Sequence, residues 1–180
     1  MSSEAEEFCY SPYDLAVVIS NRQMDVMETD AFLTWIVNNE KDRIQEAYRD
    51  NPQKLFTRTY RYLSFLHHKR ATKAEQAAIA KDNRDAGINT NVNAFIFEAE
   101  DQHHFLKNLR LRILYFNEGG QARTTLRQIL KHYGYRRRSH KIIEEIEDYL
   151  DALGLVVKEG SNENDLFKVK LDDRIVISAK

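Results

Sequence analysis

A run of basic residues between positions 121 and 141 is the part of the chain whose residue types are best suited to binding a polyanion. It contains seven Lys and Arg residues and no Asp or Glu. A planar guanidinium group donates two hydrogen bonds to one guanine edge or to one phosphate. Clustering of this kind is the electrostatic footprint of polyanion binding, and the run ends in Arg136, Arg137, Arg138, Ser139, His140 and Lys141.

A second basic segment spans residues 51–84, with eight Lys and Arg residues against two acidic ones. On a helix, its aromatic residues such as Tyr62 are expected to face the core and leave a basic stripe outside. Such a stripe would extend a DNA footprint, or pair with residues 1–50, which carry 11 acidic and 4 basic residues. Both alternatives stay open for the stripe residues: Arg58, Arg61, Lys69, Arg70 and Lys73.

The charge reverses directly after Lys141. Five acidic side chains occupy the exposed side of the helix expected there, and carboxylates are repelled by phosphates. DNA contact would therefore be confined to the first turn of this helix. Alternatively, the acidic face binds a basic protein partner. The acidic residues are Glu144, Glu145, Glu147, Asp148 and Asp151.

Residue patterns that would support catalysis or metal binding are sparse. The pairs His67–His68 and His103–His104 are the nearest approach to a metal site, but neighbouring residues on a helix point about 100° apart and rarely bind one ion. The sequence contains no phosphate-binding glycine loop, nucleophile elbow or cysteine-ligand spacing. We expect no enzymatic activity, no metal and no cofactor.

The composition is that of a globular protein, since 42% of the 180 residues are hydrophobic and 31% are charged. Cys9 is the single cysteine, and no N-terminal stretch resembles a secretion signal. The longest apolar run, "LAVVI" at 15–19, is far shorter than the roughly 20 residues that span a bilayer. These features predict a cytoplasmic, nucleoid-associated protein that does not enter a membrane.

The first hundred residues are predicted to be a helical region for oligomerisation or partner contact, and residues 101–180 a second domain. Three helix starts are marked in the first region: Ser11 with Pro12, Thr29 or Asp30, and Lys54 after the Asn51–Pro52 break. The third helix is expected to reach about Asp82, with Leu55, Tyr62, Phe65 and Leu66 on its buried side. Gly87 would end it, and residues 88–95 would form a linker.

The second domain combines helical and strand-like patterns. Apolar steps of three and four predict helices at 103–116, after Thr124 or Thr125, and at 139–154, with breaks at Gly119–Gly120 and Gly134. Alternating residues then predict a hairpin of strands at 155–159 and 166–171. Residues 174–178 would add a third strand or a tail.

This order of elements over residues 102–171 resembles the winged helix-turn-helix superfamily. The resemblance lies in "ILYFNEGGQARTTLRQIL", where a Gly-Gly break leads to a short capped helix, and in "YLDALGLVVKEG", where a helix runs into a hairpin. It implies that the third helix places its N-terminal residues in the major groove while the second helix and the wing contact the backbone. In this sequence the resemblance makes the groove-facing candidates Arg136, Arg137, Arg138, Ser139, His140 and Lys141. Thr124, Thr125 and Arg127 would then bind a phosphate at the start of the second helix.

The predicted fold is therefore mainly α with a small β-hairpin: a helical N-terminal region followed by a winged helix-turn-helix domain. The predicted function is binding of double-stranded DNA in transcription regulation or in DNA replication and maintenance. A homodimer is expected, because two-fold symmetry doubles the specificity of one short recognition tip. The alternative is a protein–protein interaction subunit of a larger complex without direct DNA contact.

Overall fold

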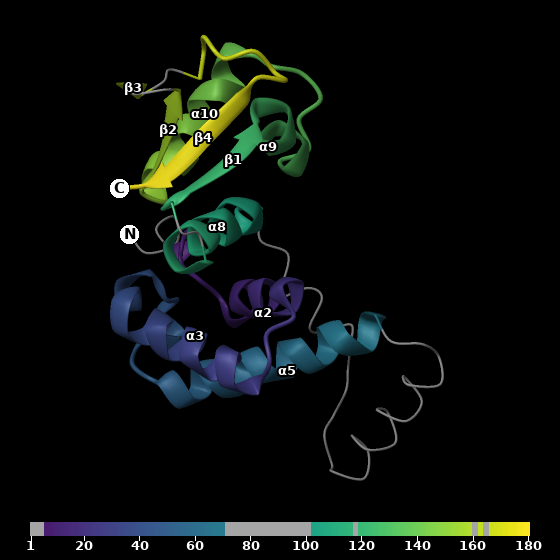
Figure 1. Ribbon diagram of the computed structural model, residues 1–180, viewed down its shortest axis with the longest axis vertical. Helices are drawn as coiled ribbons and strands as arrows, with labels where there is room; N and C mark the ends of the chain where they lie inside the picture. Colours follow the sequence, from purple (N-terminus) through teal and green to yellow (C-terminus); the bar gives the residue numbers. More distant parts are fainter. Residues whose placement is uncertain (1–5, 71–101, 117–118, 160–161, 164–165) are drawn as a thin grey trace. The chain divides into compact units, whose positions relative to one another are not determined.

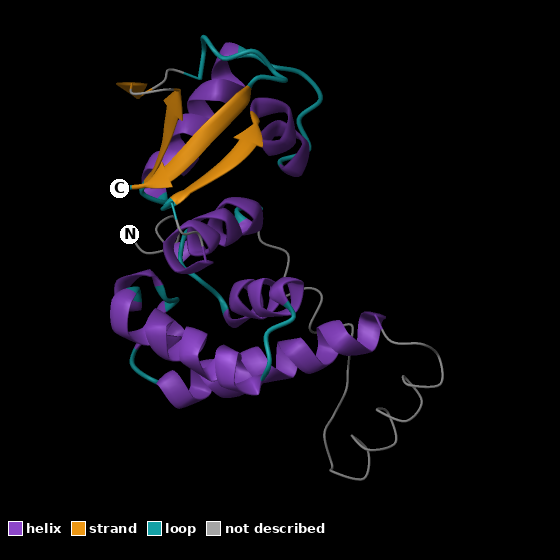
Figure 2. Cartoon of the chain, viewed as in Figure 1, coloured by secondary structure: helices purple, strands orange, loops and turns teal. Residues whose placement is uncertain are grey.

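The computed structural model describes residues 6–70, 102–116, 119–159, 162–163 and 166–180 (Figure 1), with residues 68–70, 159 and 162–163 described by their backbone alone. The chain falls into two compact units. Unit 1 combines residues 1–8 with 102–180, and unit 2 contains residues 9–101. Among the described residues, helices predominate and strands occur only in unit 1 (Figure 2).

Unit 2 begins with α2 (Pro12–Arg22), whose start is fixed by a capping box. The Ser11 hydroxyl accepts a hydrogen bond from the Asp14 amide at 3.1 Å, and the Asp14 carboxylate accepts one from the Ser11 amide at 2.9 Å. Proline occupies the first helical position, where its missing amide costs nothing. The predicted start of this helix is confirmed.

The second helix, α3 (Val26–Asn39), starts earlier than predicted. Its N-cap is Asp25 rather than Thr29 or Asp30, and the Thr29 amide already donates to the Asp25 carbonyl inside the helix. The prediction was wrong because it followed the apolar residues that face the core. Val26 and Met27 in the first turn are 67% and 82% exposed, so they do not belong to that face. Two short helices follow, η1 (Lys41–Arg43) and α4 (Glu46–Arg49).

Helix α5 (Pro52–Arg70) packs against α2 in unit 2. The Asn51 side chain caps it by accepting from the Lys54 amide at 2.9 Å. Predicted core residues Leu55, Tyr62 and Leu66 are buried, while Phe65 is half-buried. The predicted continuation to Asp82, the stop at Gly87 and the linker at 88–95 lie outside the described residues.

Unit 1 combines helices with a small antiparallel sheet, where the sequence predicted helices and a β-hairpin. Its helical elements are α8 (His104–Leu111), the π-helical η2 (Arg112–Phe116), α9 (Leu126–His132) and α10 (His140–Ala152). The strands are β1 (Gln121–Thr125), β2 (Leu155–Glu159), β3 (Asn162–Glu163) and β4 (Arg174–Ala179), in the sheet order β1-β4-β2-β3.

Two details of the sheet differ from the prediction. Residues 121–125 form β1, which the sequence did not indicate, because Ala122 is the only apolar residue of QARTT and the segment shows no alternation of apolar and polar residues. Residues 166–171 form turns and no strand, although Leu166 and Val169 are buried. The strand that returns beside β2 is β4, which contains residues 174–178 and also pairs with β1.

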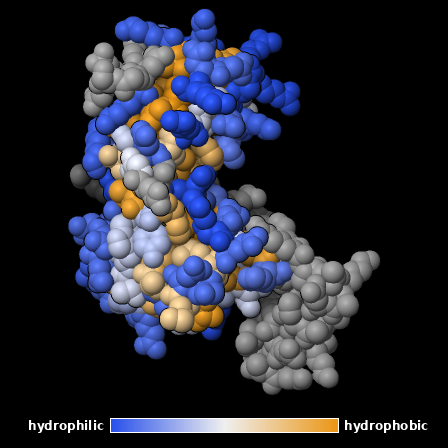
Figure 3. All heavy atoms as spheres, viewed as in Figure 1, coloured by the Kyte–Doolittle hydropathy of each residue, from blue (hydrophilic) through white to orange (hydrophobic). Residues whose placement is uncertain are grey.

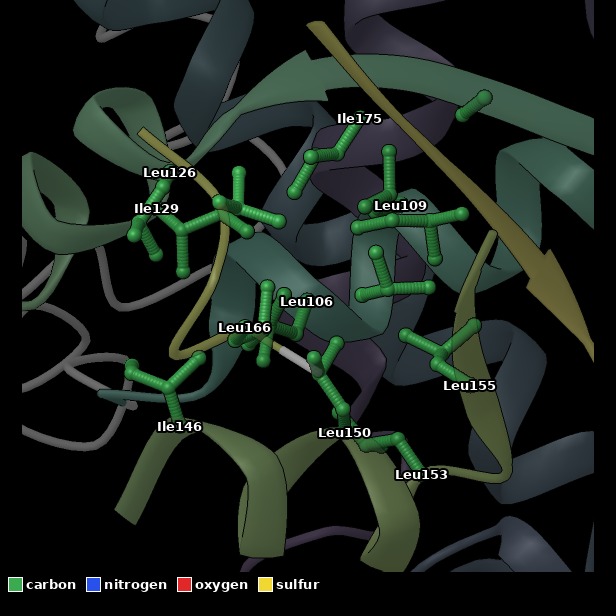
Figure 4. Close-up of a cluster of buried hydrophobic side chains, with 14 of the residues drawn as sticks. Leu106, Leu109, Leu126, Ile129, Ile146, Leu150, Leu153, Leu155, Leu166 and Ile175 are labelled. Carbon is green, nitrogen blue, oxygen red and sulfur yellow. The ribbon is translucent and has the colours of Figure 1, made fainter. Parts of the chain in front are cut away.

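The core of unit 1 is an apolar cluster between its helices and the inner face of the sheet. Ile146, Leu150 and Leu153 point from α10 into this cluster, where Leu106 and Leu155 also lie (Figure 4). Ile146 and Leu153 are 0% exposed and Leu150 is 4% exposed. Burial of this face fixes α10 and therefore fixes the loop that leads into it.

Candidate nucleic-acid interface

The loop between α9 and α10, residues 133–139, is anchored at both ends. Gly134 ends α9 in the left-handed conformation with φ 76°, and the Tyr135 amide donates to the Leu130 carbonyl at 2.9 Å. The Tyr135 hydroxyl donates to Glu145 of α10 at 2.7 Å. Ser139 caps α10 by accepting from the Ile142 amide at 3.3 Å. The middle of the loop is thus presented from fixed ends.

Arg136 and Arg137 occupy the middle of this loop, and both are exposed. Neither forms a hydrogen bond or an ion pair with any residue that the structure describes. They directly precede Arg138 and the Ser139 cap of α10. Their positive charges are therefore available to a ligand at the start of this helix.

Arg138 is half-buried and turned into unit 1. Its guanidinium group donates to the carbonyl oxygen of Leu166 at 3.1 Å, and also to those of Phe167 and Val169. These carbonyls belong to the loop before β4, residues 166–173. Arg138 therefore holds that loop beside the start of α10, and its donors are used within the fold.

The first turn of α10 carries two further predicted contacts, His140 and Lys141, which are exposed. His140 Nδ1 lies 3.1 Å from Glu144 Oε1, and Lys141 Nζ lies 3.9 Å from Glu145 Oε1. The His140 ring also lies 4.3 Å from the Phe167 ring. Exposed pairs of this kind contribute about 0–1 kcal/mol, so a phosphate can compete for either side chain.

The start of α9 contains the remaining predicted contacts. Thr125 is the N-cap, in a capping box with Gln128, which confirms a capped start. Thr124 is buried, and its hydroxyl donates to the Gln128 side chain at 2.9 Å. Arg127 is exposed but donates to both carboxylate oxygens of Asp172, at 2.6 and 2.8 Å, and holds the pKa of Asp172 below its usual range.

Four of the five acidic residues of α10 have partners inside unit 1. In addition to Glu144 and Glu145, Glu147 accepts from the Leu166 amide at 3.1 Å. Asp151 lies 2.5 Å from Lys180 Nζ, and this ammonium group lowers the pKa of Asp151. The fifth, Asp148, forms no ion pair with the described residues. Of these four, Glu145 and Asp151 lie beside a lysine, while Glu147 accepts from a neutral amide, so the negative charge of α10 is compensated only in part.

Two exposed lysines were not among the predicted contacts. Lys131 lies in the last turn of α9, and Lys170 lies in the loop before β4. Lys131 belongs to the acid-free run and could have been included on that basis, whereas Lys170 was assigned to a strand. Figure 3 shows many hydrophilic side chains on the visible face of unit 1.

The predicted basic stripe of unit 2 is described for two of its five side chains. Arg61 is exposed, whereas Arg58 is half-buried with its guanidinium carbon 5.5 Å from the centroid of the Tyr62 ring. Lys73 lies outside the described residues, as do the side chains of Lys69 and Arg70.

Within the described part of the chain, no group of three or more His, Cys, Asp or Glu residues is arranged to hold a metal ion. None of the helices among the described residues is long and apolar enough to cross a membrane. Comparisons of the chain with protein-family models, curated proteins and solved structures gave no match.

Proposed function

We propose that the chain is a double-stranded DNA-binding protein of the winged helix-turn-helix type that acts in transcription regulation or in DNA replication and maintenance. The tip of α10 would enter the major groove. The observation that carries the proposal is the pair Arg136 and Arg137, two exposed arginines without partners among the described residues, on an anchored loop directly before α10.

The order of elements in unit 1 supports this proposal. A first helix α8 is followed by the short α9, an anchored turn, the longer α10, β2 and a returning strand, which is the order on which the superfamily resemblance rests. The loop before β4 would be the wing, and Arg138 ties it to the start of α10. Lys170 would then reach the DNA backbone from this loop. We also propose a homodimer, which light scattering would test.

The alternative, docking of a basic protein on the acidic face of α10, has less support. Four of the five acidic side chains on that face already bind groups of unit 1. A partner would have to displace these contacts, since Asp148 is the one acidic side chain of this face that forms no hydrogen bond or ion pair with the described residues. No specific observation therefore favours the protein-docking function over DNA binding.

The test is a titration of fluorescently labelled random-sequence duplex DNA with the protein, repeated over a salt series. A protein that neutralises several phosphates loses affinity steeply as salt rises. The double variant Arg136→Ala/Arg137→Ala should keep its circular dichroism spectrum, bind more weakly and show a salt slope reduced by about two, since each lost phosphate contact lowers that slope by about one. Arg138 is left in place because its loss would disturb the loop before β4.

A matched control removes two exposed arginines elsewhere in unit 1, as Arg112→Ala/Arg123→Ala. It changes the net charge equally and should bind DNA within about threefold of the unmodified chain, a difference well below 1 kcal/mol. Equal losses in both variants would show binding by overall charge and contradict the α10 tip. Absence of any binding at low salt would exclude the DNA-binding function.

A further inference from the structure

A pocket of about 470 Å³ lies on unit 2 beside the first half of α5. It belongs to no part of the proposed DNA interface. Its volume falls within the range of about 300–1,000 Å³ that is common for small-molecule sites. The residues that give it chemical character are Lys54, Arg58, Arg61, Thr57, Asn51 and Tyr48.

Helix geometry places the three basic residues of the pocket together. Lys54, Arg58 and Arg61 follow one another at steps of four and three, which puts them on one face of α5. The Lys54 ammonium group lies 5.1 Å from the centroid of the Tyr48 ring and donates to the Ala47 carbonyl at 3.3 Å. Arg58 lies against the Tyr62 ring. Two of the three cations are thus held in place before any ligand arrives.

None of the lining residues that the structure describes carries a carboxylate, so they do not balance the positive charge in the pocket. Asp50 precedes the lining residue Asn51, but it pairs with Lys41 at 2.9 Å, and Lys41 lowers the pKa of Asp50. Neither Lys54 nor Arg61 forms an ion pair with a residue that the structure describes. A concave site with uncompensated cations attracts anions.

We propose that this pocket binds a small molecule that carries at least two linked phosphates. Lys54, Arg58 and Arg61 together carry three positive charges, which is more than the roughly 1.5 to 2 negative charges of a single phosphate group. The arginine fork matches phosphate oxygens, and Thr57 adds a hydroxyl donor. The concave shape suits a small molecule better than the backbone of a duplex. The site lies in unit 2 and does not rest on DNA binding by unit 1.

The experiment is isothermal titration calorimetry of the full chain with sodium pyrophosphate at constant ionic strength. We expect saturable binding at one site and an increase in Kd of at least about tenfold for Lys54→Gln/Arg61→Gln, a loss of about 1.4 kcal/mol. Both residues are exposed, so this variant should keep its fold. Amide chemical shifts of Gln53 and Thr57, measured by NMR in the unmodified chain, should change on addition of pyrophosphate.

The matched control is Arg136→Gln/Arg137→Gln, which should retain pyrophosphate binding while it loses duplex DNA. The pocket variant should retain duplex DNA. The proposal is overturned by absence of saturable pyrophosphate binding, by an unchanged Kd in the pocket variant, or by an equal loss in the control. Loss of duplex binding in the pocket variant without pyrophosphate binding would assign the three cations to the DNA backbone instead. Because the two ligands are measured separately, failure of the DNA-binding proposal leaves the pyrophosphate result unaffected.

Discussion

Arg138 donates hydrogen bonds to three backbone carbonyl groups of the loop before β4, whereas the described residues offer no hydrogen-bond partner to its neighbours Arg136 and Arg137. The three arginines are consecutive and chemically identical. What separates them is the position of acceptors 28 to 31 residues further along the chain. A basic run therefore divides into one residue that stabilises the fold and two that can bind a ligand.

Replacement of Arg138 tests this division. Arg138→Ala should lower the free energy of unfolding by about 1–3 kcal/mol, because partly buried carbonyls lose a charged donor. Arg138→Lys should restore only part of the lost stability, since one ammonium group cannot reproduce the planar arrangement of donors in a guanidinium group. Arg137→Ala is the control, with an expected change within about 0.5 kcal/mol. Urea unfolding followed by circular dichroism measures all three, and equal stability of the two alanine variants would contradict the role given to Arg138.

Tyr135 gives unit 1 a stability that depends on pH. Its hydrogen bond to Glu145, together with burial, raises the pKa of Tyr135 to about 12. The folded pKa exceeds the unfolded value of about 10, so this contribution is complete below pH 10 and is lost as pH rises from about 10 to about 12. Urea unfolding at pH 9, 10 and 11 should show a steeper loss of stability for the unmodified chain than for Tyr135→Phe.

Tyr60 provides the comparison for this pH dependence in unit 2. Burial and a hydrogen bond to Asp30 raise the pKa of Tyr60 to about 12 as well. In Tyr135→Phe, the free energy of unfolding should therefore still fall somewhat in the same pH window. Adding Tyr60→Phe should make this fall smaller. Identical pH slopes for the unmodified chain and Tyr135→Phe would show that the Glu145 contact contributes nothing.

At the scale of elements, the sequence predicted what depends on near neighbours. The caps at Ser11 and Thr125 bind amides three residues away, and Gly134 ends α9 within one turn. Such contacts are contained in a short window of sequence, so residue type and spacing identify them. The apolar face of α10 was predicted for the same reason.

The parts that could not be predicted depend on distant partners. Strand β1 exists because residues 121–125 pair with 174–178, and only Ala122 and Thr124 of this strand are buried. Residues 166–171 alternate as a strand would, but Arg138 binds their carbonyls and holds them as turns. One residue of the candidate site could not be assessed from the sequence for the same reason. Arg127 is paired with Asp172, which lies 45 positions away in the chain.

The packing of α10 supplies a prediction at this scale. Ile146 is 0% exposed and lies in the core of unit 1, so Ile146→Ala should lower the free energy of unfolding by about 2–5 kcal/mol. Asp148→Ala changes an exposed position of the same helix and should stay within about 0.5 kcal/mol. Urea unfolding of both variants measures the difference. A midpoint for Ile146→Ala equal to that of the unmodified chain would show that α10 does not pack through this face.

At the scale of the whole molecule, the two units are not simply consecutive. Phe8 belongs to unit 1, where its ring centroid lies 4.4 Å from that of His103 and 6.1 Å from that of Tyr149. Unit 2 therefore forms an insertion between residues 8 and 102, and unit 1 is completed by a segment nearly one hundred residues away in sequence. Residue 8 was predicted to belong to a helical region of residues 1–100, because local patterns do not reveal an aromatic contact with residues more than ninety positions away.

This arrangement can be tested with the single tryptophan of the chain, Trp35, which lies in unit 2. Phe8→Ala should lower the stability of unit 1 by roughly 1–3 kcal/mol, because a half-buried ring is lost. Hydrogen exchange of α8 and α10 should accelerate, while the unfolding transition seen by Trp35 fluorescence stays in place. Leu33→Ala, which empties a fully buried position in unit 2, should do the opposite: it should shift the Trp35 transition by about 2–5 kcal/mol and leave exchange in α10 unchanged. If Phe8→Ala instead moved the Trp35 transition and spared α10, residue 8 would contribute to the stability of unit 2, and the division of the chain at residue 8 would be wrong.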